Sequence, residues 1–151
     1  MTWTSLKPYA VASSNEDSWV LMPDGTVAAP SCIVPGSTCV YDNATDTWKL
    51  GNSLPLNIVS AVGSEVGPGL LRYDGTAFFL GGNQNTAVYS PSSTPQWSNG
   101  PSLPQQNGQI LGIMDGPGVL LPSGNVLFAA APVDNSGGFN PPCFYFEFDG
   151  A

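Results

Sequence analysis

Short apolar segments alternate with glycine-containing turns along the whole chain. In the middle of the chain, the segments 69–73, 76–80, 86–90 and 96–98 are rich in β-branched, aromatic and other apolar residues. Asp74-Gly75 separates the first two segments and suits a two-residue hairpin, because both residue types accept positive φ angles. The pattern predicts four antiparallel strands here, and no segment has the apolar spacing of a helix.

The same pattern recurs about every fifty residues. Its turn glycines, Gly25, Gly75 and Gly124, are 50 and 49 residues apart. A period of this size is typical of propeller blades, small sheets that bury their faces only against neighbouring sheets. We therefore expect a single all-β domain of three four-stranded blades, at residues 16–55, 65–104 and 115–151. Residues 1–8 are predicted to supply the outer strand of the third blade.

Three features of the second repeat resemble the kelch motif: the double glycine Gly81-Gly82, then Tyr89, then Trp97. The string from Leu21 to Val27 also resembles blades of the galactose-oxidase-like kelch group. The resemblance covers essentially the whole chain as three blades, although the first and third repeats replace the double glycine by Ala28-Ala29 and Ala129-Ala130. It implies a propeller fold and leaves function open, since such propellers serve as scaffolds and as enzymes.

Three blades form an open arc, because closed propellers have about four to eight. The two unmatched apolar faces predict a partner, and the simplest is a second copy that gives a six-bladed ring with a two-fold axis. In that homodimer, Trp3 and Leu6 of one chain would complete the third blade of the other. A fragment of a longer propeller is the main alternative. The list of predicted assembly residues is Trp3, Leu6, Phe144, Phe146 and Phe148.

The spacing between tyrosine and tryptophan supports this exchange of strands. It is 7 residues from Tyr41 to Trp48 and 8 from Tyr89 to Trp97. If Trp3 follows the C-terminal end of another copy in space, Tyr145 and Trp3 have a similar spacing. Trp3, Trp48 and Trp97 are therefore expected to pack within blades, with stacking on sugars as the alternative.

The charge balance excludes several partners. The chain has a net charge of −8 and only three basic residues, so we expect no binding to nucleic acid or to anionic membranes. No apolar run is long enough to span a membrane, and the first residues lack the features of a signal peptide. A cytoplasmic or virion-assembled protein is expected, without further indication of its location.

Four acidic residues form the best-patterned polar feature. Glu16, Glu65 and Asp115 are 49 and 50 residues apart, and Asp17 follows Glu16. They should gather at the mouth of the central channel, where converging carboxylates suit a cation such as calcium or a basic group of a partner. Structural acids that accept hydrogen bonds between blades are the alternative. No other cofactor or metal site is predicted.

The connection between the second and third strands of the last repeat is longer than its counterparts. Loops that depart from a repeated scaffold often carry function, so this loop is a candidate contact with a protein partner. A passive insertion is the alternative. The candidate contact residues are Asp134, Asn135, Phe139 and Asn140.

The three cysteines lie near repeat positions. Cys32 and Cys39 flank a predicted hairpin, where they form either a disulfide or a reduced buried pair. Cys143 aligns with Cys39 and is expected to be a buried packing residue.

No set of catalytic residues emerges. The chain has no histidine, which removes histidine-based triads and the copper site of the galactose-oxidase-like group. We predict a non-enzymatic binding or structural module that oligomerises and binds a protein through its loops or rim. A carbohydrate-binding or glycan-active propeller that uses the channel-mouth carboxylates is one alternative, and a subunit of a virion or extracellular fibre is another.

Overall fold

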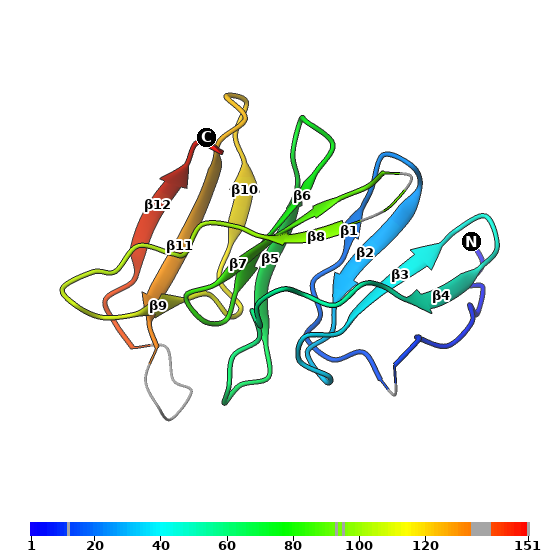
Figure 1. The fold of residues 1–151 in the computed structure, drawn as a ribbon, viewed down its shortest axis with the longest axis horizontal. Coiled ribbons are helices and arrows are strands. Elements are labelled where there is room, and N and C mark those ends of the chain that lie inside the picture. The colour runs from blue at the N-terminus through cyan, green and yellow to red at the C-terminus, as the bar shows by residue number, and fades with distance from the viewer. Residues whose placement is uncertain (12, 93, 95, 134–139, 151) are drawn as a thin grey trace.

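The structure is a computed structural model, and it describes residues 1–11, 13–92, 94, 96–133 and 140–150. Within these residues the chain has twelve strands and no helix, arranged as three four-stranded antiparallel sheets. The predicted all-β class is confirmed, and no sheet closes into a barrel. Figure 1 shows the sheets side by side, with the N-terminus near one outer sheet and the C-terminus on the other.

Sheets 1 and 2 share one design, in which consecutive strands pair in chain order. The pairing places Tyr41 opposite Trp48 in sheet 1 and Tyr89 opposite Trp97 in sheet 2. Each sheet therefore ends in a fourth strand whose tryptophan lies beside a tyrosine, as the sequence predicted. Sheet 1 consists of β1 (Val20–Leu21), β2 (Thr26–Pro30), β3 (Thr38–Asp42) and β4 (Thr47–Leu50), and sheet 2 of β5 (Val66–Leu71), β6 (Ala77–Gly81), β7 (Thr86–Ser90) and β8 (Gln96–Asn99).

Sheet 3 differs at its outer edge. Its strands β10 (Gly118–Leu120), β11 (Val126–Pro132) and β12 (Phe144–Phe148) pair in order, but β9 (Leu111–Gly112) pairs with the far end of β11. Among the described residues β12 thus has one neighbouring strand, where β3 and β7 have two. Residues 1–8 form no strand in this single chain, so their predicted pairing with another copy stays a prediction.

The register of sheet 3 corrects one detail of the repeat. Tyr41 pairs with Val27, Tyr89 with Ala77, and Phe148 with Val126. Phe148 therefore occupies the repeat position of the two tyrosines, whereas Tyr145 lies three residues earlier on β12 and is exposed. The tyrosine-to-tryptophan spacing inferred from Tyr145 is wrong, because the longer connection before β12 shifts the alignment of the sequence.

The hairpin turns show why the glycines recur. Gly25, Gly75 and Gly124 have φ angles of 86°, 82° and 92°, a left-handed conformation that disfavours residues with a Cβ. In the first two turns, the preceding aspartate accepts hydrogen bonds from the backbone N–H and the hydroxyl of Thr26 or Thr76, at 2.7–2.9 Å. Sequence and local geometry therefore agree at the turn that marks each repeat.

The sheets bury two apolar cores between them. We call the face of a sheet that points towards the next sheet in the chain its forward face, and the opposite one its rear face. Val20 on the forward face of sheet 1 lies against Gly69 on the rear face of sheet 2, where a Cβ would come within 2.6 Å of the valine. Gly118 likewise lies over Pro68 and Leu70. Glycine at this rear-face position allows neighbouring sheets to approach closely.

Candidate functional site

Three of the predicted channel-mouth acids lie together at the starts of the inner strands. Burial raises the pKa of Glu65, and the adjoining Glu16 carboxyl and the charge of Asp115 raise it further. The Oε2 atom of Glu65 is buried without a hydrogen-bond partner. A proton on Glu65 would reduce the repulsion and let the two glutamates share a hydrogen bond. The fifty-residue spacing thus identified residues that are neighbours in space.

Asp17, the fourth predicted acid, has a structural role in sheet 1. Its Oδ1 accepts a hydrogen bond of 2.6 Å from the backbone N–H of Cys32. Burial raises the pKa of Tyr9, and the nearby Asp17 carboxylate raises it further. Asp17 therefore holds the segment before β1 against sheet 1, which is the behaviour expected of a structural acid.

The arrangement of the acids lacks the features of a metal centre. Within the described part of the chain, no group of three or more His, Cys, Asp or Glu side chains is placed to hold a metal ion. Bound carboxylates must also be ionised, whereas the surroundings of Glu65 favour its protonated form. The predicted role of this cluster as a cation site has no geometric support.

The cysteines differ from the sequence interpretation at one position. Cys32 and Cys39 are buried free thiols, and burial together with Asp17 raises the pKa of Cys32 to about 12. Cys143 is an exposed free thiol, so its predicted burial is wrong. The register places Phe146 at the repeat position of Cys39, because they pair with Phe128 and Ala29 on equivalent strands.

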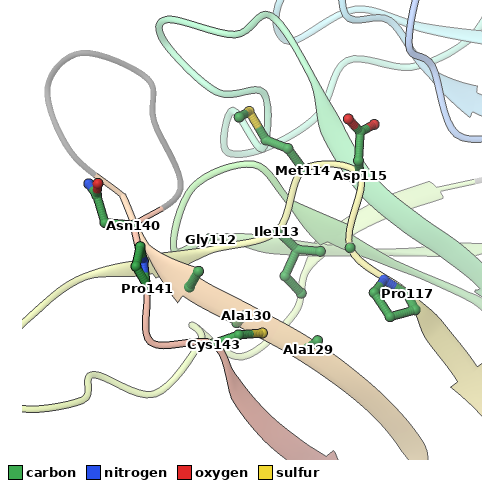
Figure 2. A pocket seen from close by; sticks show the side chains of 12 residues that line it. Gly112, Ile113, Met114, Asp115, Pro117, Ala129, Ala130, Asn140, Pro141 and Cys143 are labelled. Atoms are coloured by element: carbon green, nitrogen blue, oxygen red, sulfur yellow. The ribbon is translucent and has the colours of Figure 1, made fainter.

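The predicted partner loop falls mostly outside the described residues. Asp134, Asn135 and Phe139 belong to that undescribed segment, whereas Asn140 is exposed and donates its backbone N–H to Pro132 O at 3.1 Å. Asn140 also borders a cavity of about 620 Å³ at the inner end of sheet 3. Figure 2 shows this cavity between the segment that carries Met114 and Asp115 and the small side chains of β11.

The spaces beside sheets 1 and 2 that correspond to this cavity are filled. In each case, the segment that leads into the next sheet occupies the space. Beside sheet 1, Ile58 and Val59 share a buried cluster with Cys32. Beside sheet 2, Leu111 and Ile113 share a buried cluster with Leu80. Among the described residues no further sheet lies beyond sheet 3, and the cavity of about 620 Å³, with its mostly apolar lining, occupies the corresponding place.

The outward faces of sheets 1 and 3 carry exposed apolar side chains, and the face of sheet 3 also carries the exposed Glu147, which pairs with Leu127. On the forward face of sheet 3, Val119 is 50% exposed, whereas its counterpart Val20 in sheet 1 is 4% exposed. Leu127 is 37% exposed, whereas its counterparts Ala28 and Phe78 are fully buried. The molecule thus presents at one end a face of the kind that it buries in its interior.

The rear face of sheet 1 carries an aromatic cluster that the sequence analysis did not identify. The Trp19 ring lies 5.0 Å from Trp48, the Tyr9 ring lies 4.4 Å from Trp48, and Tyr41 completes the group. They border a cavity of about 340 Å³, and Trp19 is 52% exposed. A signal was present in the repeat, since Trp19 stands where the later sheets have Gly69 and Gly118.

The predicted assembly residues lie in two separate places. Phe144, Phe146 and Phe148 are half-buried on β12, where Phe148 packs on Phe78 at 4.8 Å and Phe146 on Phe128 at 5.6 Å. Trp3 is fully exposed, and Leu6 is 58% exposed and borders the cavity beside Trp48 of sheet 1. Within one chain the structure does not bring the two groups together.

Comparison with known proteins gives no match, either among protein-family models or among curated proteins. In the described residues, no helix is long and apolar enough to cross a membrane. The function must therefore be inferred from the surfaces of the molecule.

Proposed function

We propose that the chain is a non-enzymatic structural or binding module that forms half of a six-bladed, kelch-like propeller ring, closed by a second copy. The observation that carries the proposal is the exposed forward face of sheet 3. Val119 and Leu127 are exposed on that face, whereas the counterpart of Val119 is buried in sheet 1 and partly buried in sheet 2, and both counterparts of Leu127 are buried. Apolar faces of this kind associate in water, and a two-fold dimer is the commonest closed assembly.

The open cavity at the inner end of sheet 3 supports the same arrangement. In a closed ring, the segment that leads into sheet 1 of the second copy would lie where Ile58–Val59 and Leu111–Ile113 lie in the other sheets. Tyr9 to Val11 is the corresponding segment, 49 residues before 58–60. We therefore expect residues 9–11 of the second copy to fill this cavity.

Trp19 indicates that the contact between copies differs from the internal contacts. Gly69 and Gly118 allow close approach of successive sheets, but the tryptophan at this position prevents the same approach by sheet 1. A half-exposed tryptophan in the centre of an interface is a typical source of binding energy. We expect Trp19 to pack across the forward face of sheet 3 from the second copy, over Val119.

The mass in solution tests this proposal. Light scattering is expected to give twice the 15.7 kDa of one chain, and Leu127→Glu should shift the mass towards one chain by placing a charge on the apolar face. Leu56→Glu is the matched control, because Leu56 is also exposed but belongs to the connection between sheets 1 and 2. A monomeric wild-type chain at tens of micromolar, or a dimer unaffected by Leu127→Glu, would overturn the proposal.

A glycan-active ring is the second candidate, and the Glu16–Glu65 pair favours it. A glutamate with a raised pKa beside a second carboxyl resembles the acid pair of a glycosidase. The adjoining position of the two carboxyls argues against it, because glycosidases hold their two carboxyls about 5–9.5 Å apart. Release of reducing sugar from a panel of polysaccharides, lost in Glu65→Gln, would replace the first proposal with this one.

A further inference from the structure

We propose that the outer edge of sheet 3 is a binding site for residues 2–5 of a second copy, with the Trp3 side chain inserted beside Phe128 and Phe148. This inference rests on the proposed closure by a second copy and adds the exchange of a strand. Its evidence is independent of the exposed forward face of sheet 3, because it concerns the edge strand and the rear face.

Each complete sheet has a tryptophan at this place. In sheet 2, the ring of Trp97 lies 5.0 Å from Tyr89 and 5.0 Å from Phe79. In sheet 1, Trp48 lies 5.2 Å from Tyr41. Sheet 3 keeps the corresponding aromatic partners, Phe148 and Phe128, but no strand of the described chain presents a tryptophan to them.

A cavity marks the place on sheet 3. It has a volume of about 140 Å³ and lies between the chain leaving sheet 2 and the aromatic side chains of sheet 3. Leu103 lines it, and the equivalent residue Leu54 belongs to the buried cluster that contains Trp97. The site on sheet 3 is therefore lined by residues equivalent to those that surround Trp97 in sheet 2. Its lining includes Leu103, Pro104, Phe128, Phe146 and Phe148.

Among the described residues, the outer edge of β12 pairs with no further strand. An edge strand of this kind adds a further strand through main-chain hydrogen bonds, and pockets for alternate side chains make the addition specific. The segment Thr2-Trp3-Thr4-Ser5 is uncharged and carries a fully exposed tryptophan. Because the N-terminus and β12 lie at opposite ends of the molecule (Figure 1), the strand has to come from another copy.

The inferred pairing stops before Leu6. In sheets 1 and 2 a glycine, Gly51 or Gly100, follows the fourth strand, and a Cβ at that glycine would clash with the hydroxyl of Thr38 or Thr86. Sheet 3 has Tyr145 at the corresponding position, and residues 1–8 contain no glycine. The exchanged segment therefore cannot leave the sheet as the chain does after the fourth strand of sheets 1 and 2. Leu6 instead borders the aromatic cavity of its own chain.

The register of the other sheets gives a cross-linking test. Lys49 pairs with Val40 and Ser98 with Val88, so Thr4 of one copy should face Glu147 of the other. Thr4→Cys with Glu147→Cys, in a Cys143→Ser background, is expected to oxidise to a disulfide-linked dimer. Antiparallel neighbours have the Cα separation that a disulfide needs.

The matched control is Ser5→Cys with Glu147→Cys in the same background. A shift of one residue turns the side chain to the opposite face of the strand, so this pair should cross-link at least about tenfold more slowly. Equal rates for the two pairs, or a disulfide within a single chain, would overturn the exchange of strands.

Loss of the tryptophan provides the second measurement. Trp3→Ala should raise the dissociation constant of the dimer at least about thirtyfold in sedimentation experiments, as expected for a central aromatic anchor. Thr2→Ala is the control and should leave it within about threefold. A wild-type monomer would reject the ring itself, whereas a dimer of unchanged affinity in Trp3→Ala would reject only the exchanged strand.

Discussion

Sheets 2 and 3 have the same inner hairpin but different outer edges. In both, a tight turn with a left-handed glycine joins two strands that pair in the same register. Sheet 2 continues to β8 and buries Trp97, whereas sheet 3 ends at β12 with half-buried phenylalanines and a cavity. The comparison shows that the sequence of one repeat is sufficient for its inner hairpin, whereas burial of its outer edge depends on a further strand.

A repeat of this kind is stable only when both of its faces are covered. Sheet 2 has a sheet on each side and contains four of the largest fully buried side chains, which are Phe78, Phe79, Leu80 and Thr86. Among the described residues, sheet 3 has a neighbouring sheet on one side only. Under the proposed closure by a second copy, the stability of sheet 3 should depend on assembly, and variants in the two sheets should respond differently.

The largest difference is expected at the central phenylalanine. Phe79→Ala should cost about 4 kcal/mol of unfolding free energy, because the ring is fully buried against Trp97. The equivalent Phe128→Ala should cost about 2–3 kcal/mol, since Phe128 already borders a cavity. Urea midpoints at one protein concentration measure the difference. If a second copy fills that cavity, the difference between the two losses of unfolding free energy should narrow as protein concentration rises. A larger loss of unfolding free energy for Phe128→Ala than for Phe79→Ala would contradict this comparison.

The outer tryptophans give the next largest effect. Trp97→Ala should cost about 3 kcal/mol, because its ring is buried between Tyr89 and Phe79. Trp48→Ala should cost about half as much in the single chain, since Trp48 is only half-buried on an outward face. Thermal unfolding of both variants checks this order, and equal losses would mean that the rear face of sheet 1 is already covered.

The order of these effects follows from features that the sequence partly predicted. The fifty-residue repeat was sufficient for the strands and hairpins, because turn chemistry and alternation of apolar residues are local properties. It also placed Glu16, Glu65 and Asp115 together, since equivalent positions in stacked sheets are neighbours.

Other features depended on packing that the spacing does not reveal. The long connection in the last repeat moved Phe148 to the position assigned to Tyr145 and left Cys143 exposed. Strand β9 was not expected, because Leu111-Gly112 pairs through the backbone with the extended end of β11. The aromatic cluster around Trp19 was missed because it combines residues from different strands and from the segment before β1.

A buried hydroxyl gives a smaller effect. Thr86 donates a 2.7 Å hydrogen bond to Pro101 O, where the chain leaves β8. Thr86→Val should cost about 1 kcal/mol, because the buried Thr86 side chain loses its hydrogen bond to the carbonyl of Pro101. At the equivalent position of sheet 3, Tyr145→Thr makes the reverse change and should alter stability by no more than about 0.5 kcal/mol, since no described strand lies beside β12 to accept the new hydroxyl. Chemical denaturation distinguishes the two, and a gain of more than 1 kcal/mol from Tyr145→Thr would contradict it.

The smallest expected effect is the pH dependence of Glu65. Its pKa in the folded chain is raised above the ordinary value of 4.5 by burial and by Glu16, so the folded state binds this proton more tightly than the unfolded state. The corresponding stability is fully present below pH 4.5 and is lost as pH rises through the raised pKa. Glu65→Gln should remove this loss, so the variant should have a higher free energy of unfolding than wild type above pH 4.5. The difference should stay below about 1 kcal/mol, because solvent screens the cluster. Asp115→Asn, which removes one neighbouring charge, should give a smaller part of the same change. Melting curves from pH 4 to pH 8 test it, and a gain that is equal at every pH would show that the carboxyl of Glu65 is not responsible.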